Sequence, residues 1–498
     1  MKVIILAAGI GSRLKPITNE KPKCLVKVSG KSILEYQLFG LTESGVRQED
    51  INVVVGYKKD MIKNHLKEQF NEVNIIVNDD FLSTNNMYSL YLALKKININ
   101  DEQVIICNGD CIYDFKILHN IVKDYENNLI AAQKSEYLEE SMKIIFNENK
   151  IIKISKQIKK DVAYGNSIDL YKLTNSSIKN LKKIIDFFIE TKKDLNSWTE
   201  VALDKLLDTD NFIPYDIKND KWIEIDNYND LILADQIFSK FDLSKKKCII
   251  LDLDGTTYLG DIPIEGTINF IKKNWEKFDF KFITNNTSNT PLYYLNKLKK
   301  FGIDIKLENI ITPLNPLINY INEKELSKIF FVLNDQVIEF IKQNIENYIN
   351  NFNDDECQAV VVGYDTDLTY AKLRRVSNLL NNKPDLSYLA THKDLVCPTQ
   401  LGPIPDSGSI IKILEIATNR KPNIIFGKPN RVLIYQIFEK YNPDEILFVG
   451  DRIYTDKKFA NDLNIDFVLV LSGETKREEV EELDKFPELI VNSLGDLI

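Results

Sequence analysis

The sequence predicts an α/β protein with two mostly parallel, doubly wound sheets in separate domains. Its 498 residues exceed what one hydrophobic core usually holds, about 250–300 residues. Short apolar runs alternate with helical patterns, which favours parallel strands covered by helices. The alternation stops at a polar stretch, residues 242–247, and starts again at Cys248. We therefore expect a domain boundary there.

The first domain is expected to span residues 1–242. Its predicted strands are short, buried apolar runs: Val3–Ala8, Ile51–Val55, Ile75–Val77 and Val104–Cys107. A last strand is predicted at Trp222–Asp226, followed by a closing helix at Asn229–Phe241. This order is typical of a mostly parallel, doubly wound sheet.

The second domain is expected to consist of a core with an inserted cap. Core strands are predicted at Cys248–Leu251, Phe280–Ile283, Ile424–Phe426 and Ile446–Val449. A long segment between them has strands of its own, Ile329–Val332 and Ala359–Val362. We assign the core to residues 247–290 and 416–498, and the cap to residues 291–415.

Composition excludes several classes of protein. With 44% hydrophobic and 28% charged residues, each domain should be an ordinary soluble globule. A net charge of −9 argues against a nucleic-acid binder, which needs a basic face. The first apolar run is too short for a signal peptide, and no stretch approaches the ~20 apolar residues of a membrane helix. We expect a cytoplasmic protein without membrane insertion. A homo-oligomer is compatible with the sequence.

The cysteines and histidines indicate neither a zinc site nor a disulfide framework. The chain has three histidines, and its six cysteines show no CxxC spacing: Cys24, Cys107, Cys111, Cys248, Cys357 and Cys397. Reduced, mostly buried thiols are the expected state.

The first site follows the first strand. The run Leu6 to Arg13 (LAAGIGSR) places the small residues Ala8, Gly9 and Gly11 where backbone N–H groups can approach a triphosphate, with a cation after them. Such turns are common, but here Pro22-Lys23-Cys24-Leu25 extends the pattern to LAAGxGxRLxPxTxxxPKxL. This pattern resembles the sugar-phosphate and alcohol-phosphate nucleotidyltransferases, a GT-A-like Rossmannoid family.

The resemblance implies a reaction at the α-phosphorus of a nucleoside triphosphate. Arg13 would contact the departing pyrophosphate, and Lys23 the phosphates near the reacting centre. Asp110, at the end of a predicted strand, and Asp226 match the family's two Mg²⁺ ligands. Fixed cations and a metal offset the repulsion between the two phosphates.

Three further segments resemble the cytidylyltransferase branch, which activates phosphocholine and related small phosphates: residues 85–90 (NNMYSL), 142–144 (MKI) and 154–156 (ISK). CTP is therefore the preferred nucleotide, with UTP or dTTP and a sugar 1-phosphate as the alternative. Lys156 would contact the substrate phosphate. Asn78, Asn85 and Ser89 would lie near the base and ribose, although Asn78 and Ser89 suit helix capping or turn bonding equally well.

The acceptor is left open by the sequence. A choline site needs an aromatic cage, for which Trp198, Tyr164 and Trp222 are candidates, although they suit ordinary core positions equally well. Relatives often carry Gly-Glu where this chain has Gly165-Asn166, and Glu200 stands alone. These departures suggest an acceptor other than choline, and a phosphorylated polyol or sugar fits as well or better.

The second site begins at Asp252-Leu253-Asp254-Gly255-Thr256, directly after a predicted strand. That placement aims both carboxylates out of the carboxyl edge of a parallel sheet. Three pieces follow in order: residues 284–286 (TNN), 427–429 (GKP) and 450–456 (GDRIYTD). Together they resemble the haloacid dehalogenase (HAD) phosphatases that carry the large α/β cap.

This second resemblance implies hydrolysis of a small phosphomonoester. Asp252 would attack phosphorus, and Asp254 would act as acid and then base. Thr284 and Lys428 would bind phosphoryl oxygens, with Asn285 at the substrate. The Mg²⁺ ligands would be drawn from Asp252, Asp254, Asp451 and Asp456.

The cap departs from the family pattern at two places. His392 replaces the usual asparagine in residues 390–394 (ATHKD), and residues 405–408 (PDSG) replace a glycine-rich turn. His392 is either a substrate-specificity residue or a solvated loop residue.

The two halves together predict a bifunctional, Mg²⁺-dependent enzyme. A CTP-dependent cytidylyltransferase would make a CDP-activated precursor for a surface polymer, and a phosphatase would act at a neighbouring step. Two alternatives remain: a nucleotide-sensing module that controls the phosphatase, and a second domain that serves only for assembly.

Overall fold

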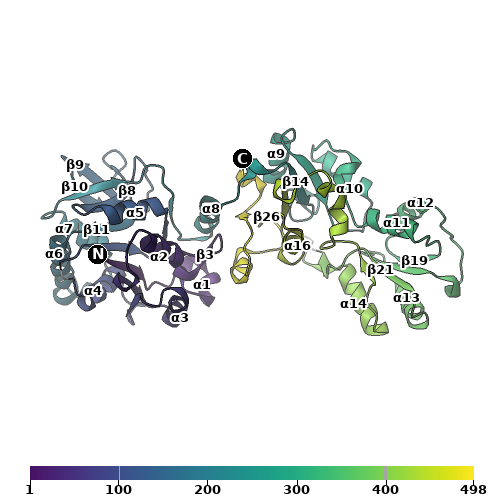
Figure 1. Ribbon diagram of the computed structural model, residues 1–498, viewed down its shortest axis with the longest axis horizontal. Helices are drawn as coiled ribbons and strands as arrows, with labels where there is room; N and C mark the ends of the chain where they lie inside the picture. Colours follow the sequence, from purple (N-terminus) through teal and green to yellow (C-terminus); the bar gives the residue numbers. More distant parts are fainter. Residues whose placement is uncertain (100, 398–400, 498) are drawn as a thin grey trace. The chain divides into compact units, whose positions relative to one another are not determined.

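The computed structural model describes residues 1–99, 101–397 and 401–497. The chain divides into two compact units, Met1–Phe238 and Ser239–Ile498 (Figure 1). Each unit is built around its own sheets and cores, and each is described separately below.

The first unit is organised around a nine-stranded sheet. Its main path runs β10-β9-β11-β6-β1-β4-β5, and β8 pairs with both β11 and β12. The strands are β1 (Lys2–Ala7), β4 (Ile51–Val55), β5 (Asn74–Val77), β6 (Val104–Asn108), β8 (Asn128–Lys134), β9 (Lys143–Asn147), β10 (Lys150–Ser155), β11 (Gly165–Leu173) and β12 (Phe212–Asp216). Strands β5, β4, β1 and β6 are parallel, as predicted, whereas β11 runs antiparallel to β6.

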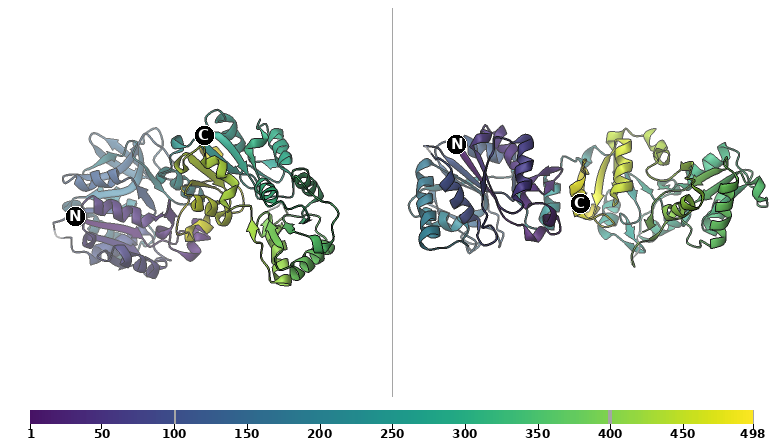
Figure 2. Two further views of the ribbon diagram at one scale, coloured as in Figure 1. Left: turned by 45° about the vertical axis from the view of Figure 1, so that its right-hand side comes forward. Right: turned by 90° about the horizontal axis from the view of Figure 1, so that it is seen from below.

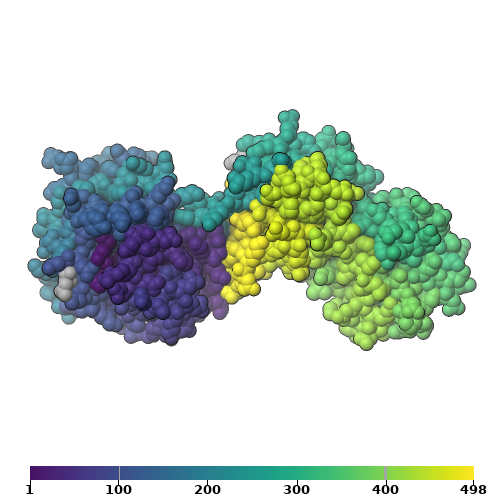
Figure 3. All heavy atoms as spheres, in the orientation of Figure 1, coloured from purple at the N-terminus to yellow at the C-terminus, as the bar shows by residue number. Residues whose placement is uncertain are grey.

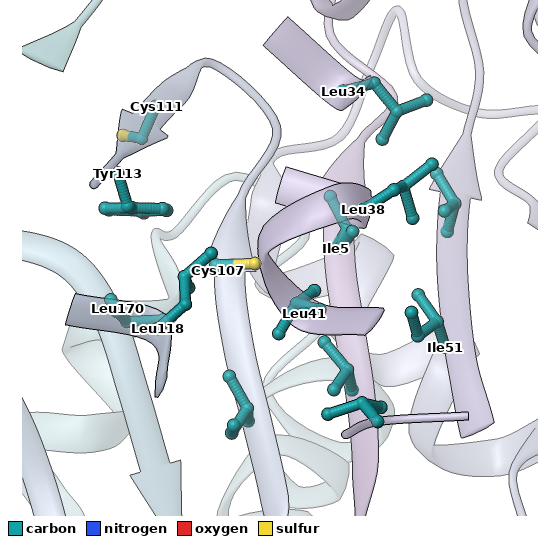
Figure 4. Packing of buried hydrophobic residues seen from close by; sticks show 14 of the residues in the cluster. Ile5, Leu34, Leu38, Leu41, Ile51, Cys107, Cys111, Tyr113, Leu118 and Leu170 are labelled. Carbon is teal, nitrogen blue, oxygen red and sulfur yellow. The ribbon is translucent and has the colours of Figure 1, made fainter. Parts of the chain in front are cut away.

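Helices cover both faces of this sheet. They are α2 (Ile33–Glu43), α3 (Lys59–Gln69), α4 (Asn86–Lys96), α5 (Phe115–Lys123), α6 (Asn175–Asp186) and α7 (Thr199–Leu206), whereas α1 (Ile17–Glu20) and α8 (Tyr228–Phe238) pack in a separate small cluster. On one face, Leu34, Leu38 and Leu41 of α2 pack on Ile5 of β1 and Ile51 of β4 (Figure 4). The opposite face is covered by α4, α6 and α7.

The strand predicted at Trp222–Asp226 is present as β13 (Trp222–Glu224), but it does not join the main sheet. It pairs antiparallel with β7 (Cys111–Tyr113) in a separate two-stranded sheet. This ribbon starts just after β6, so it carries residues 110 and 226 to the same place at the carboxyl edge of the main sheet.

The second unit has a parallel six-stranded core sheet in the order β18-β17-β14-β25-β26-β27. The strands are β14 (Cys248–Asp252), β17 (Asp279–Ile283), β18 (Ile310–Ile311), β25 (Ile446–Gly450), β26 (Asp466–Val470) and β27 (Leu489–Val491). Helices α9 (Glu265–Lys273), α10 (Pro291–Lys300), α15 (Tyr435–Phe438) and α16 (Lys458–Leu463) accompany them. Figure 2 shows this sheet from two further directions.

The inserted cap has a second, four-stranded parallel sheet in the order β19-β20-β21-β24. The strands are β19 (Ile329–Val332), β20 (Ala359–Val362), β21 (Ser387–Ala390) and β24 (Ile424–Ile425). The helices are α11 (Leu314–Glu323), α12 (Asp335–Gln343), α13 (Tyr370–Asn382) and α14 (Ser407–Thr418). In Figure 3 the inserted segment, in green, forms a lobe of its own.

The limits of the cap differ from the sequence prediction of residues 291–415. Strand β24 pairs with β21 of the cap, so the expectation of a core strand at 424–426 is wrong. At the other end, β18 pairs with β17 of the core, and the apolar face of α10 packs in the core cluster. The insertion therefore runs from about residue 312 to residue 426, because hydrogen bonding across the sheets, rather than strand pattern, decides which sheet a strand joins.

Candidate active sites

A cavity of about 430 Å³ lies at the carboxyl ends of β1 and β6 in the first unit. The structure brings together there the residues that the sequence assigned to phosphate, metal, nucleotide and acceptor binding, apart from the aromatic candidates: Leu6, Ala8, Gly9, Gly11, Arg13, Lys23, Asn78, Asn85, Ser89, Asp110, Lys156, Glu200 and Asp226. The ends of parallel strands are where such cavities form in α/β folds.

The glycine loop is shaped by its contact with Lys23. Gly11 has a φ of 67°, and a Cβ atom there would lie 2.8 Å from the Cβ of Lys23. A larger residue would therefore be strained and would push Lys23 away. The Thr18 hydroxyl donates to the Gly11 carbonyl at 2.9 Å and fixes the loop from the other side.

Lys23 lies between two carboxylates. Its Nζ is 2.8 Å from Asp110 Oδ2 and 2.9 Å from Asp226 Oδ1. Arg13 Nη2 lies 2.9 Å from Asp226 Oδ2. Burial lowers the pKa of Lys23, but Asp110 and Asp226 outweigh it and raise that pKa above its usual value. Lys23 is therefore held as an ammonium ion at the mouth of the glycine loop.

The carboxylate oxygens of Asp110, Glu224 and Asp226 lie within 4.8 Å of one another. Oxygen ligands of this kind suit Mg²⁺. Sequence reasoning missed Glu224, although its spacing of two from Asp226 puts both residues on one side of an extended segment. Burial, followed by Asp169 and Asp110, raises the pKa of Glu224 to about 9. A bound cation would relieve this repulsion, so the donor set fits a metal.

Two further carboxylates line the inner wall of the cavity. The Tyr171 hydroxyl lies 2.9 Å from Glu200 Oε1 and 3.0 Å from Asp169 Oδ1, and Asn108 Nδ2 donates to Asp169 Oδ2 at 3.1 Å. Burial, then Glu200 and Asp110, raise the pKa of Asp169 to about 7. Asp169 was also missed, because it stands inside β11 without a motif.

The residues expected near the base and ribose, Asn78, Asn85 and Ser89, line the cavity beside α4. Asn78 Nδ2 donates to Ser89 Oγ at 3.0 Å and to Thr84 Oγ1 at 3.1 Å. Asn85 caps α4 by accepting from Asn86 N at 2.8 Å. Asn85 Nδ2 donates to the Asn196 carbonyl at 3.2 Å. All three predicted residues thus line the cavity while serving the local structure as well.

The aromatic candidates do not form a cage. Trp198 lines the cavity, where Lys156 Nζ lies 4.8 Å from its ring centroid. Tyr164 instead contacts Phe146 edge-on, and Trp222 donates its indole N–H to Gln133 at 3.0 Å. The three rings are held on different elements by different partners, so the cage hypothesis is wrong.

The second unit holds a buried site at the carboxyl end of β14. Lys428 Nζ contacts Asp252 Oδ1 and lies 2.7 Å from Asp456 Oδ1. Burial lowers the pKa of Lys428, but these two carboxylates raise it overall. Burial also raises the pKa of Asp252, against the effect of Lys428. Residues from three of the predicted motifs, 252–256, 427–429 and 450–456, therefore lie in contact.

Three carboxylates of this site, Asp252, Asp451 and Asp456, have oxygens within 4.8 Å of one another. Burial and Asp456 raise the pKa of Asp451 to about 7. A Cβ atom on Gly473 would meet Asp451 Oδ2 at 2.0 Å, so the chain can surround this carboxylate only because a glycine stands there. The set suits a divalent cation with oxygen ligands.

Asp254, predicted as both catalytic and metal-binding, stands outside this carboxylate cluster. Burial raises its pKa, whereas Lys297, Arg452 and a hydrogen bond with Asn286 lower it. A carboxyl group held in this environment suits proton transfer. The expectation of a side-chain metal ligand at this position does not match the cluster.

Thr284, Asn285 and His392 lie where core and cap meet. Thr284 Oγ1 accepts from Asn286 N at 3.0 Å. Asn285 uses both ends of its amide on protein partners, Lys428 N and Asp394. His392 is fully buried, with its ring 3.4 Å from Asp406 and 3.8 Å from Asp394, so it is not a solvated loop residue.

Three family models match the chain. "Nucleotidyl transferase" matches residues 2–137, "Haloacid dehalogenase-like hydrolase" residues 249–344, and "HAD-hydrolase-like" residues 425–497. The chain is 30% identical over 255 residues to the 5′-nucleotidase YutF of Bacillus subtilis, covering 51% of this chain and 97% of that one. It is 30% identical over 244 residues to the acid sugar phosphatase of Staphylococcus haemolyticus, covering 48% and 91%.

A similar solved structure is the 4-nitrophenylphosphatase of Thermotoga maritima, which is 34% identical with a TM-score of 0.47 and covers 51% of this chain and 97% of that one. Within the described part of the chain, no helix has the length and apolar character needed to cross a membrane.

Proposed function

This chain belongs to the haloacid dehalogenase-like hydrolases through its C-terminal half and carries a nucleotidyl transferase domain before it, and we propose that it couples cytidylyl transfer to phosphate-ester hydrolysis. It is an enzyme with a nucleotidyltransferase domain and a phosphatase domain. The finer proposal is that CTP and a phosphorylated polyol, alcohol or sugar give a CDP-activated product and pyrophosphate.

The transferase step places like charges together, and the first unit supplies the groups that offset them. The glycine loop offers N–H groups to the triphosphate, and Arg13 and Lys23 line the same cavity. In the proposed step, an acceptor phosphate oxygen bonds to the α-phosphorus while the bond to the β-phosphate oxygen breaks, and pyrophosphate leaves. Arg13 and Lys23 stabilise the charge that moves onto pyrophosphate.

The acceptor would extend toward Lys156, Asp169 and Glu200. Lys156 would pair with its phosphate, and the two buried carboxylates would accept hydrogen bonds from its hydroxyl groups. The missing aromatic cage supports a polyol or sugar rather than choline.

Mg²⁺ would be held by Asp110, Glu224 and Asp226 in the first unit and by Asp252, Asp451 and Asp456 in the second. When bound, it would neutralise phosphate charge and polarise the phosphoryl oxygens.

The phosphatase step would begin at Asp252. Its carboxylate attacks phosphorus and the ester P–O bond breaks, while Asp254 gives a proton to the leaving alcohol. Asp254 then takes a proton from water, which attacks phosphorus and releases phosphate from Asp252. Lys428 and Thr284 would hold the phosphoryl oxygens. The protonated form that burial favours at Asp254 is the form that the first step needs.

The observation that carries the proposal is that both sites have an ammonium ion set among clustered carboxylates. A purely structural second domain would not need to bury such groups together, because each buried charge is costly. A sensor without chemistry would not need to gather the ammonium and the carboxylates at one cavity. Since both sets are complete, we propose that the domains act at successive steps in a cytoplasmic pathway.

The test is to incubate the protein with Mg²⁺, each common NTP or dTTP, and a panel of small phosphates, and to follow pyrophosphate and free phosphate by phosphorus NMR. We expect pyrophosphate with CTP and one acceptor, lost in Asp110→Ala but kept in Asp252→Asn. Free phosphate should show the opposite dependence. Pyrophosphate with UTP or dTTP instead would move the proposal to a sugar-1-phosphate transferase. No pyrophosphate with any pair would favour the sensor.

A further inference from the structure

Asp394 of the cap reaches into the phosphatase site without being part of any sequence-predicted set. Its Oδ2 accepts from Asn285 Nδ2 at 3.1 Å and from Arg452 Nη1 at 3.2 Å. Asn285 and Arg452 both belong to the core, and the Asp394 side chain is 2% exposed. One cap carboxylate thus joins two segments of the core, those after β17 and after β25.

Asn285 transmits this contact to the catalytic lysine. Its Oδ1 accepts from the backbone N–H of Lys428 at 2.7 Å, and the Lys428 ammonium in turn contacts Asp252 and Asp456. The cap also supports the residue before the lysine, because Gly427 N donates to the Thr391 carbonyl at 2.5 Å. The path from the cap carboxylate to the nucleophile therefore passes through one asparagine and one lysine.

Asp394 and the Lys428 backbone together determine which way the Asn285 amide faces. An asparagine side chain offers a carbonyl on one side and an NH₂ group on the other, whereas a carboxylate can only accept hydrogen bonds. The Asn285 NH₂ group therefore faces Asp394, at 3.1 Å, and also lies 3.4 Å from the Lys428 carbonyl oxygen, while the Asn285 carbonyl accepts from Lys428 N. With a neutral amide at position 394, only the Lys428 backbone would hold the Asn285 amide in this direction.

Burying this carboxylate is costly, which argues that it has a role. Asp394 Oδ1 has no hydrogen-bond partner among the described residues, and buried ion pairs such as Asp394–Arg452 seldom add net stability. An apolar contact would hold the cap at least as well. It could not set the direction of the Asn285 amide.

We propose that Asp394 is a positioning residue of the phosphatase, which fixes Asn285 and through it the Lys428 loop, so that the lysine ammonium faces Asp252. The inference rests on the phosphatase function of the second unit. It makes the cap a requirement for the phosphorylation step itself and not only for substrate selection.

The test compares steady-state hydrolysis of 4-nitrophenyl phosphate by full-length variants. Asp394→Asn should lower kcat roughly 10- to 100-fold, the range of a misplaced catalytic group, with KM within about threefold. Asp406→Asn is the matched control, because Asp406 is equally buried in the same loop but its hydrogen bonds lie within the cap, as with Ser407 N. It should keep kcat within about threefold of wild type.

A reversed pair gives the sharper result. Asn285→Asp alone should lose at least as much kcat as Asp394→Asn, because two carboxylates then face each other. In the double variant Asp394→Asn/Asn285→Asp, the carboxylate at 285 accepts from Lys428 N and from the new amide at 394. We expect its kcat to exceed that of Asn285→Asp by about tenfold or more, since the hydrogen bonds between residues 394 and 285 and between residue 285 and Lys428 N are restored.

A double variant no better than Asn285→Asp, or Asp394→Asn with the kcat of Asp406→Asn, would overturn the positioning role. Circular dichroism and thermal unfolding of each variant separate misfolding from misplacement, and the rescue by the double variant does not depend on them. If the wild-type protein itself hydrolyses no phosphomonoester while Asp252→Asn behaves identically, the proposed phosphatase function fails instead.

Discussion

The two sites hold a lysine in the same way but at different depths. Lys23 lies between Asp110 and Asp226, and Lys428 between Asp252 and Asp456. The Lys23 side chain is 12% exposed and its partners 27% and 25%, whereas Lys428 is 3% exposed and its partners 8% and 0%. The first arrangement can be opened by an incoming ligand, and the second is part of the interior.

Because of this difference in depth, we expect the two lysines to contribute differently to activity and to stability. In an open site, water can solvate the carboxylates when the lysine moves to a phosphate, so losing the lysine should cost activity alone. In the closed site, the Lys428 ammonium contacts Asp252 and Asp456 in the protein interior, so losing it should cost both activity and stability. Variants of the two lysines and of residues beside them test this distinction.

Lys428→Met should give the largest effect. It leaves Asp252 and Asp456 buried without the ammonium that contacts both, which should destabilise the second unit by about 3–5 kcal/mol. Phosphatase activity should fall by about 10³-fold or more, because the phosphoryl charge is no longer stabilised. Calorimetry of the full chain should show one unfolding transition moving to lower temperature while pyrophosphate release is kept. An unchanged transition would mean that the closed site tolerates its charges without the lysine.

Lys23→Met should be as damaging to the transferase but not to the fold. Pyrophosphate release should fall about 10³-fold through loss of charge stabilisation. The unfolding temperature of the first unit should shift by only a few degrees, because an accessible ion pair is worth about 0–1 kcal/mol. Calorimetry alongside the NMR assay measures both quantities. A shift as large as that for Lys428→Met would remove the distinction between open and closed sites.

The sequence predicted the parallel cores and most of each site, because strand ends and glycine loops follow local pattern. The predicted residues of the first site line one cavity, apart from Tyr164 and Trp222. The sequence could not assign β24 to the cap, since a short apolar run carries no information about which sheet it joins. Glu224, Asp169 and Asp394 were missed for a related reason, because only the folded chain brings them close to the other residues of each site.

The pH dependence of unfolding tests whether a carboxylate of the open site is protonated. Burial, then Glu200 and Asp110, raise the pKa of Asp169 from 3.8 to about 7. A raised pKa means that the folded state prefers the protonated form, so the stability this gives is present below pH 3.8 and is lost as the pH rises through about 7.

Asp169→Asn lacks this dependence. The free energy of unfolding of the variant relative to wild type should move in the variant's favour by roughly 1–3 kcal/mol between about pH 4 and pH 8. Denaturant unfolding of the first unit at several pH values measures it, and the constant cost of lost hydrogen bonds cancels in the difference. A pH-independent difference would mean that Asp169 is ionised throughout.

The smallest effect is expected at Trp198, which is 44% exposed and contacts the Lys156 ammonium through its ring face. Trp198→Leu keeps an apolar side chain but removes the ring, and a cation–π contact at such a site is worth about 0.5–1 kcal/mol. The KM for the acceptor should therefore rise about two- to fivefold. The KM for CTP should stay constant, because the contact lies with the residue proposed to bind the acceptor phosphate.

Tyr164→Leu, whose ring packs on Phe146 away from the cavity lining, is the control and should leave both values unchanged. A fall of 100-fold or more in acceptor affinity on Trp198→Leu would contradict the view that charge and hydrogen bonds, rather than aromatic contact, select the acceptor. The measured change in KM would also show how strongly solvent weakens the contact between Trp198 and Lys156. The contacts of Lys428 in the closed site are shielded from solvent.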